Sequence, residues 1–255
     1  MLGVVLDADV ALAEANSGKS VLLAEQDATL GGSLRNSCMQ IDGKHSDTWL
    51  SDQVDLVNAN DNIDLRTRTT TVGLYDHNYA LLLSNPSAGV RQELLRVRAG
   101  KIIIATGALE QPLVFENNDR PGIMLLGAVE GLARRFGVNA GKNIVVAGNH
   151  DRLYQAAATL SGQGLTISAV VDARTDVPEP VRQPAEQAGI RVITGHMPLN
   201  TKGGKRLTSV IFNAVDSDAT ISLKCDTLAI SGGYAPAVHL ACHAKLPLQI
   251  GRAHV

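Results

Sequence analysis

The sequence contains few cysteines, few aromatic residues and no excess of either charge. Its three cysteines, Cys38, Cys225 and Cys242, are far apart and form no C-x-x-C pair, which argues against a thiol–disulfide reductase and favours a reducing compartment. Aromatic residues make up 3% of the chain and the net charge is −2, so no nucleic-acid partner is indicated. No stretch reaches the roughly 18 to 20 apolar residues of a membrane span, and no cleavable signal is visible at the start. We therefore expect a cytoplasmic α/β protein with no membrane or nucleic-acid partner.

The sequence does contain a strand that stops in a turn of small residues. Residues 101–105 form a β-branched run that is typical of the middle of a parallel sheet. Thr106 and Gly107 then allow the backbone to approach a ligand closely, and Pro112 prevents a regular continuation. The pattern predicts a nucleotide-facing turn at Ala105, Thr106 and Gly107. An ordinary strand followed by a loop is the alternative.

A second buried strand, at residues 21–25, ends in an acidic residue. In dinucleotide folds a carboxylate at this position accepts hydrogen bonds from the adenosine ribose and repels a 2′-phosphate. Glu25 therefore predicts NAD or FAD rather than NADP, although a solvated charge at a strand end is the alternative interpretation. Gly31 and Gly32 follow at the distance where a second glycine turn lies beside the cofactor.

The glycine-rich phosphate turn is missing at the front of the chain. A complete fold of this kind begins with a buried strand and G-x-G-x-x-G. Counting back from Glu25 places those glycines at Leu2, Val4 and Asp7, and none of these residues is glycine. Asp7 and Asp9 would also repel a diphosphate at the start of the following helix. We expect the first strand and its glycine loop to be absent, as in a chain that begins inside a longer gene.

A second strand–helix–strand unit begins near residue 141, and its phosphate turn is degenerate. Gly148 opens a segment in the G-x-G-x-x-G register, but His150 and Leu153 replace the later small residues. The His150 ring would obstruct a pyrophosphate, and Leu153 would hold the helix away from the strand. Asp172 still ends the next strand at the ribose position. We expect this second turn to bind no dinucleotide.

These features predict an α/β fold with two Rossmann-like domains of the FAD/NAD(P)-binding, disulfide-reductase-like type. The first domain is expected at residues 1–110, with a small antiparallel insertion at about 62–98. The second, degenerate domain follows at 111–224, and 225–249 are expected to return to the first domain. Residues 250–255 match the translation of a common sequencing adapter and are expected to be a non-native tail.

Hydrophobic periodicity places the expected elements more closely. Helices are expected at residues 8–16, 49–60 and about 153–161. Strands are expected at 64–72, 79–84 and 91–97, with a hairpin turn at 85–89, and in the parallel sheets at 102–105, 142–147, 165–171 and 225–233.

Four separated stretches resemble the alpha subunit of heterotetrameric sarcosine oxidase. The resemblance spans about residues 10–249, and the stretches occur in the same order as in that family. Opine oxidase and hydrogen cyanide synthase subunits share the A-T-G turn at residues 105–107 that precedes Pro112. The four stretches are residues 69–78, 105–115 with 118–124, 170–174, and 225–240.

The resemblance implies that NAD is held noncovalently in the region of this chain. It implies Glu25 as the ribose carboxylate, Gly31 and Gly32 as the turn beside the cofactor, and Thr106 and Gly107 as the nucleotide-facing turn.

Three further positions are expected to contact the cofactor. Val72 lies in the first of the four stretches, and Gly232 and Gly233 end the last expected strand, where they would close over the nucleotide in the first domain. No metal site is expected, because no carboxylate accompanies His239 and His243.

The resemblance also implies a larger assembly. Such an assembly oxidises sarcosine to glycine, passes electrons between FAD and FMN to oxygen, and transfers a one-carbon unit to tetrahydrofolate. Amine oxidation would occur on a beta-type flavin subunit, while smaller subunits would complete the hetero-oligomer, so no catalytic residue is expected in this chain. The alternatives are part of an opine or amino-acid dehydrogenase, part of a hydrogen cyanide synthase-like enzyme, and a noncatalytic nucleotide-binding scaffold.

Overall fold

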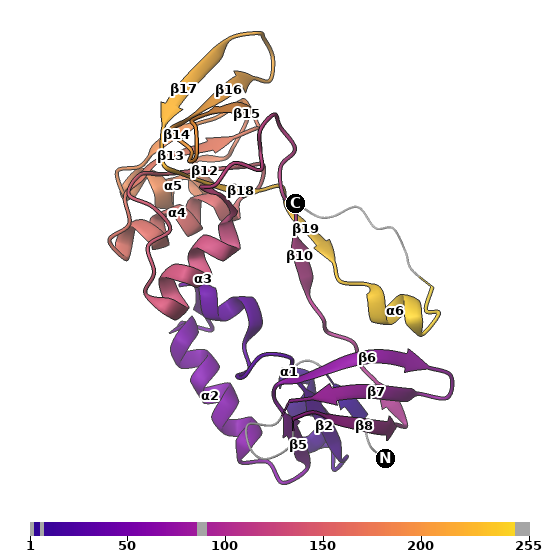
Figure 1. The fold of residues 1–255 in the computed structure, drawn as a ribbon. Coiled ribbons are helices and arrows are strands. Elements are labelled where there is room, and N and C mark those ends of the chain that lie inside the picture. The colour runs from indigo at the N-terminus through magenta and orange to yellow at the C-terminus, as the bar shows by residue number, and fades with distance from the viewer. Residues whose placement is uncertain (1–2, 6–7, 86–90, 248–255) are drawn as a thin grey trace. The chain divides into compact units, whose positions relative to one another are not determined.

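The computed structural model describes residues 3–5, 8–85 and 91–247, which form two compact units (Figure 1). Among these residues, unit 1 comprises 3–5, 8–34, 39–85, 91–108 and 236–247, and unit 2 comprises 35–38 and 109–235. The expected α/β architecture with parallel sheets and an antiparallel insertion is confirmed.

Unit 1 is built on a parallel sheet with the strand order β5-β2-β1-β9. Every residue of β2 is buried, as expected for a strand covered on both faces. Helices α1 and α2 pack on one face through side chains such as Ala11 and Val57. The elements are β1 (Gly3–Val5), α1 (Ala8–Asn16), β2 (Val21–Ala24), α2 (Ser46–Asn58), β5 (Ile63–Arg66) and β9 (Lys101–Ile102).

The other face of this sheet is covered by the antiparallel insertion. Leu74, Ala80 and Leu82 pack against Leu22 of β2, and Leu240 of α6 joins the same cluster. The three-stranded insertion is therefore confirmed, except that residues 63–66 pair with β2 in the parallel sheet. Most of the hairpin turn expected at 85–89 lies outside the described residues. The elements are β6 (Thr69–Tyr75), β7 (Tyr79–Ser84), β8 (Glu93–Arg98) and α6 (His239–His243).

The expectation that the first strand is absent was wrong. Gly3–Val5 lies between β2 and β9 and pairs in parallel with both. Pairing in a sheet uses backbone groups, so a short extended segment fills this position without the usual sequence fingerprint. The link to α1, Leu6 and Asp7, lies outside the described residues, and its sequence contains no glycine.

Unit 2 repeats the same plan around a parallel sheet with the order β11-β18-β12-β13-β14. Alternate residues of β12 face opposite sides: Val146 packs against the helices, and Val145 packs against the antiparallel sheet β15-β16-β17. The strands are β11 (Ile123–Leu125), β12 (Ile144–Gly148), β13 (Ile167–Asp172), β14 (Arg191–Ile193), β15 (His196–Lys202), β16 (Ser209–Ala214), β17 (Thr220–Lys224) and β18 (Thr227–Ser231). The helices are α3 (Leu126–Phe136), α4 (Arg152–Gly162) and α5 (Glu179–Gln187).

The strand expected to return the chain to the first domain belongs instead to unit 2. Thr227–Ser231 pairs with both β11 and β12, and the return begins at Pro236. All five of its residues are buried, a pattern that identifies a central strand but not the sheet that contains it. Shorter elements are η1 (Gly32–Asn36), the hairpin β3 (Gln40–Ile41) and β4 (Lys44–His45), and the pair β10 (Ala108–Glu110) and β19 (Tyr234–Pro236).

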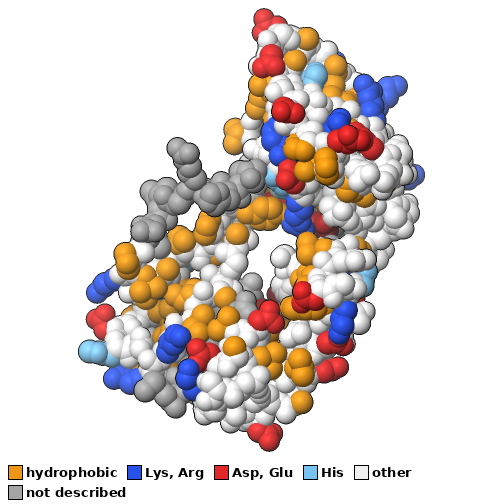
Figure 2. Space-filling view, turned by 180° about the vertical axis from the view of Figure 1, so that it is seen from behind, with side chains coloured by type: hydrophobic (Ala, Val, Ile, Leu, Met, Phe, Trp, Pro, Cys, Tyr) orange, Lys and Arg blue, Asp and Glu red, His pale blue; other side chains and the backbone are white. Residues whose placement is uncertain are grey.

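The surface carries both signs of charge. On the face drawn in Figure 2, acidic and basic side chains are interspersed among hydrophobic ones. Within the described part of the chain, no helix combines the length and the apolar character needed to cross a bilayer.

Candidate functional site

Glu25 lies immediately after β2, and its main chain is fixed on both sides. Its N–H donates to the carbonyl of Arg66 at 2.9 Å, and its carbonyl accepts the N–H of Thr69 at 2.8 Å. Glu25 Oε1 accepts the N–H of Asp27 at 2.8 Å. The side chain is partly exposed, and Oε2 has no hydrogen-bond partner among the residues that the structure describes. One carboxylate oxygen is therefore held in place and the other remains available to a ribose hydroxyl.

Val72 lies on β6, whose first residues contact the end of β2. Its side chain is 47% exposed and stands at a register shift between Thr71 and Gly73. The Oγ1 atom of Thr71 is buried and has no hydrogen-bond partner within the described part of the chain. The exposed apolar side chain of Val72 suits the face of a nucleotide base, whereas the buried Thr71 hydroxyl is not part of that surface.

Gly31 and Gly32 form the turn that begins η1. Their φ angles are 115° and 45°, a region that favours glycine. The Gly31 carbonyl accepts the N–H of Leu34 at 2.9 Å, and a Cβ built on Gly32 would meet no described atom within 4 Å. The backbone conformation therefore favours glycine, and no described side chain fills the position of a Cβ on Gly32.

The turn at Ala105, Thr106 and Gly107 is held by the returning chain. Thr106 Oγ1 donates to the carbonyl of Ala237 at 2.8 Å, and the Gly107 carbonyl accepts the N–H of Ala237 at 3.0 Å. Gly107 has a φ of 68°, and no described atom lies near the Cβ that it lacks. Because the hydroxyl proton is engaged within the protein, this turn can offer a ligand its main chain and the acceptor lone pairs of Thr106 Oγ1. Ala105 is partly buried.

Gly232 and Gly233 do not lie in the first domain, contrary to the expectation. Both belong to unit 2, where the N–H of Gly232 donates to the carbonyl of Gln111 at 2.7 Å. The N–H of Gln111 in turn donates to the carbonyl of Gly233 at 2.9 Å. Gly232 and Gly233 therefore pair the segment after β18 with the segment that contains Gln111. They lie in unit 2 because the chain returns to unit 1 only at Pro236.

Gly148, the first position of the degenerate turn, is a glycine for a packing reason. A Cβ at this position would lie 2.3 Å from the Ser231 carbonyl oxygen and 2.7 Å from the side chain of Leu153. Leu153 is fully buried and packs directly on Gly148. The close approach of backbone to backbone, rather than a phosphate, explains this glycine.

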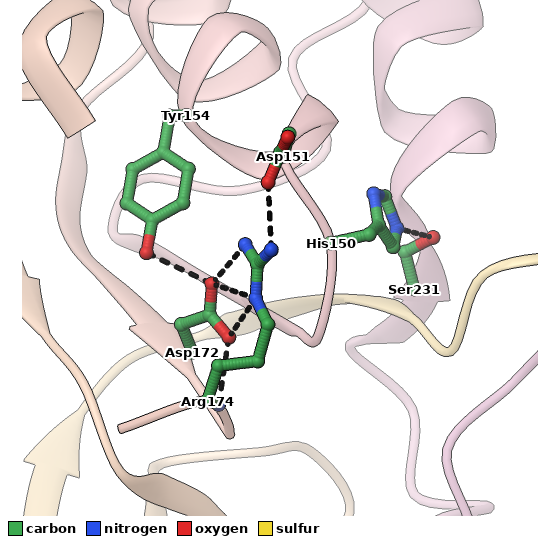
Figure 3. A network of polar contacts seen from close by, with 6 residues as sticks. All are labelled: His150, Asp151, Tyr154, Asp172, Arg174 and Ser231. Atoms are coloured by element: carbon green, nitrogen blue, oxygen red, sulfur yellow. Dashed lines mark hydrogen bonds and ion pairs between the residues drawn. The ribbon is translucent and has the colours of Figure 1, made fainter. Parts of the chain in front are cut away.

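Asp172 stands at the ribose position of unit 2, but side chains of the protein itself occupy its carboxylate (Figure 3). It is fully buried, and its Oδ2 accepts the Tyr154 hydroxyl and Arg174 Nη2, both at 2.8 Å. Arg174 also reaches Asp151 at 2.6 Å. These hydrogen bonds, above all the bond to Asp172, raise the pKa of the Arg174 guanidinium. A ribose could bind here only by breaking this network.

His150 is engaged with Ser231 rather than directed at a phosphate (Figure 3). The distance from His150 Nε2 to Ser231 Oγ is 2.8 Å, and the ring meets Tyr234 edge-on with 5.8 Å between centroids. Burial, followed by the charges of Arg152 and Arg174, lowers the pKa of His150. The imidazole is therefore neutral at neutral pH and offers no positive charge to an anion.

The partners of Asp172 were not identified from the sequence. The only signal was the arginine two residues after the strand-end acid, since Arg174 folds back onto Asp172. Tyr154 comes from the first turn of α4, and Asp151 from the residue before that helix. Their convergence depends on how α4 lies over the sheet.

Glu130 is a further acidic side chain that is almost completely buried in unit 2. It is 2% exposed, and its Oε2 accepts Arg152 Nη2 at 2.6 Å. Burial raises the pKa of Glu130 to about 7 despite the opposing charge of Arg152. Between pH 5 and 7 the folded protein therefore retains a proton that the unfolded chain has lost, so the contribution of Glu130 to stability decreases as the pH rises.

Glu130→Gln should remove this pH dependence, because glutamine cannot ionise. From pH 5 to pH 8 we expect the free energy of unfolding of the variant to rise relative to wild type by on the order of 2 kcal/mol. Urea titrations at four pH values measure this difference. Glu179→Gln, at an exposed position in α5, should show no comparable trend. If the free energies of unfolding of Glu130→Gln and wild type differed by the same amount at all four pH values, the raised pKa of Glu130 would be contradicted.

The chain is similar to sarcosine oxidase alpha subunits. It is 41% identical over 240 residues to the one from Corynebacterium sp. (strain P-1), covering 88% of this chain and 25% of that one. It is 34% identical over 241 residues to the one from Rhizobium meliloti (strain 1021), covering 91% and 24%. The resemblance predicted from the motifs is thus confirmed, and the chain spans about a quarter of the length of these relatives. No family model matches the sequence.

Solved structures show the same fold at low sequence identity. Thioredoxin reductase of T. acidophilum superposes with a TM-score of 0.75 at 14% identity, covering 98% of this chain and 82% of that one. L-proline dehydrogenase from P. horikoshii gives 0.68 at 19% identity, covering 98% and 45%. The fold is therefore that of two-domain flavin- and nicotinamide-dependent oxidoreductases.

Proposed function

We propose that this chain, as a relative of sarcosine oxidase alpha subunits, is the nucleotide-binding region of such a protein and recognises NAD through unit 1. The observation that supports this proposal most directly is Glu25, with one carboxylate oxygen fixed and the other without a partner in the described structure. Val72 on the adjoining strand and the glycine turn at Gly31 and Gly32 would complete the adenosine-binding surface, and Ala105, Thr106 and Gly107 would contribute main-chain groups.

The two ends of the proposed site fit NAD unequally. The ribose end fits, because a ribose hydroxyl can donate to the unpartnered oxygen of Glu25. The pyrophosphate end does not fit, because the link between β1 and α1 contains no glycine and Asp9 lies in the first turn of α1. An acidic residue there opposes the attraction of the helix N-terminus for anions. We therefore propose recognition of the adenosine half together with weak binding of the whole dinucleotide.

The surrounding assembly follows from the same relationship. We propose that the chain acts in the cytoplasm with smaller subunits and with a beta-type flavin subunit. In this assembly sarcosine is demethylated to glycine, FAD and FMN pass electrons to oxygen, and tetrahydrofolate receives the one-carbon unit. Within unit 2, the network around Asp172 supports a structural role rather than a second dinucleotide site. We assign no catalytic residue and no metal to this chain.

NAD should bind more tightly than NADP, because the Glu25 carboxylate repels a 2′-phosphate. Replacing Glu25 by alanine should bring the two dissociation constants to within about threefold of each other, since both ribose recognition and repulsion are lost. Saturation-transfer NMR measures such affinities in the millimolar range. Asp61→Asn, which removes an exposed carboxylate elsewhere in unit 1, should leave the preference unchanged. Equal binding of NAD and NADP by the unaltered chain would rule out this role for Glu25.

One match favours a second candidate. An opine oxidase component from Rhizobium meliloti (strain 1021) is 30% identical over 86 residues, covering 34% of this chain and 18% of that one. An opine oxidase-type protein would use the same nucleotide surface with a different amine substrate. Turnover of sarcosine, but not of opines, by the chain in its native complex would decide between them.

A further inference from the structure

Helix α2 has one side that packs into the core of unit 1 and another side that is partly apolar and lines a groove. Val54 and Val57 pack into the core of unit 1. Trp49, Asp52 and Leu56, which are spaced three and four residues apart, lie on another side of the helix, and Leu56 is 54% exposed. A surface helix normally carries only polar residues on the side away from the core, so this second, partly apolar stripe is unusual.

This stripe lines an open groove of about 650 Å³, which we call the α2 groove. The other wall of the groove comes from the β3–β4 hairpin. All of its residues belong to unit 1. They are Asp42, Lys44, Trp49, Asp52, Gln53, Asp55, Leu56 and Ala59.

The α2 groove has a negative charge that the described residues do not neutralise. Lys44 is the only basic residue among those that line it, and its Nζ is already paired with Asp52 at 2.5 Å. The carboxylates of Asp42 and Asp55 have no hydrogen-bond or ion-pair partner within the described ranges. Two unpaired negative charges thus flank exposed apolar surface.

We propose that the α2 groove binds an amphipathic segment of another polypeptide that carries lysine or arginine side chains. Basic side chains would pair with Asp42 and Asp55, and an apolar side chain would cover Leu56 beside the Trp49 ring, which also attracts cations. From Trp49 to Ala59 the helix rises by about 15 Å, so the groove accommodates about three turns of a partner helix. This interaction is separate from the nucleotide surface at Glu25 and does not depend on it.

Trp49 provides a direct test, because it is the only tryptophan of the chain. Two synthetic helical peptides of equal length serve as probes, one built from lysine and leucine and the other from glutamate and leucine. The lysine peptide should shift the Trp49 emission to shorter wavelength in a saturable and salt-sensitive way, whereas the glutamate peptide should not. The double variant Asp42→Asn/Asp55→Asn should weaken binding of the lysine peptide about fivefold.

Matched variants separate the groove from net charge. Asp216→Asn/Asp218→Asn removes the same charge from an exposed turn of unit 2 and should leave the affinity unchanged. Leu56→Ala should weaken binding without loss of the fold, because this side chain is largely exposed. Equal shifts with both peptides, or unchanged binding in the Asp42/Asp55 variant, would overturn the proposal. So would a Trp49 shift that depends on protein concentration alone, since it would show that a second copy of the chain occupies the groove.

Discussion

Replacing Arg174 by alanine should lower the free energy of unfolding of unit 2 by about 3 kcal/mol, because it leaves the Asp172 carboxylate buried without its cation. Asp172 is fully buried, and Arg174 donates to it from both its main chain and its guanidinium. The Tyr154 hydroxyl and the main-chain N–H of residue 174 remain in the variant, but two neutral donors do not replace the cation beside a buried negative charge. Urea unfolding followed by circular dichroism measures the loss. Trp49 lies in unit 1, so a transition without a change in fluorescence belongs to unit 2.

Two further variants show whether the buried charge causes this loss. Combining Arg174→Ala with Asp172→Asn should recover part of the stability, since the uncompensated charge is removed as well. Arg191→Ala, at an exposed residue of β14, should change the stability by less than about 0.5 kcal/mol. A loss below about 1 kcal/mol for Arg174→Ala would mean that the network does not stabilise unit 2.

Local patterns predicted most helices and central strands. Residues 8–16 form α1 as expected, because an alanine-rich run ends two residues before Gly18, which has a φ of 83°. The expected strand at 102–105 is shorter in the structure, since β9 ends at Ile102. The sheet β15-β16-β17 was not anticipated. Its register is set by pairing with neighbouring strands, and the sequence of a single strand does not reveal its partners.

At the candidate sites, too, the sequence of one segment did not reveal which distant residues contact it. Glu25 was predicted because a strand-end acid is a local signal, and the structure places it at the end of β2 with one oxygen unpaired in the described part of the chain. Asp172 gives the same signal, yet Tyr154 and Arg174 occupy it, and those contacts arise from tertiary packing. A strand-end carboxylate therefore indicates a ribose site only when no cation from the protein reaches it first.

This chain should bind NAD only weakly, because the residues at its pyrophosphate end are unsuitable. A dinucleotide turn supplies main-chain N–H groups and a helix N-terminus to the diphosphate. Here β1 ends at Val5, the link to α1 has the sequence Leu6-Asp7 without glycine, and Asp9 follows in the first turn of α1. Replacing residues 1–7 by a β-strand followed by G-x-G-x-x-G should lower the Kd for NAD about 100-fold, on the order of 3 kcal/mol.

The control for this replacement keeps the new strand but carries leucine, valine and aspartate at the three glycine positions. If the phosphate turn is responsible, the control should bind NAD as weakly as the unaltered chain, as measured by calorimetry. Neither protein should turn over sarcosine alone, because the proposed site of amine oxidation lies on another polypeptide. Micromolar binding of NAD by the unaltered chain would show that the β1–α1 link accepts a diphosphate without glycine. An equal gain in the control would assign the effect to the strand and to the order of the sheet around Glu25.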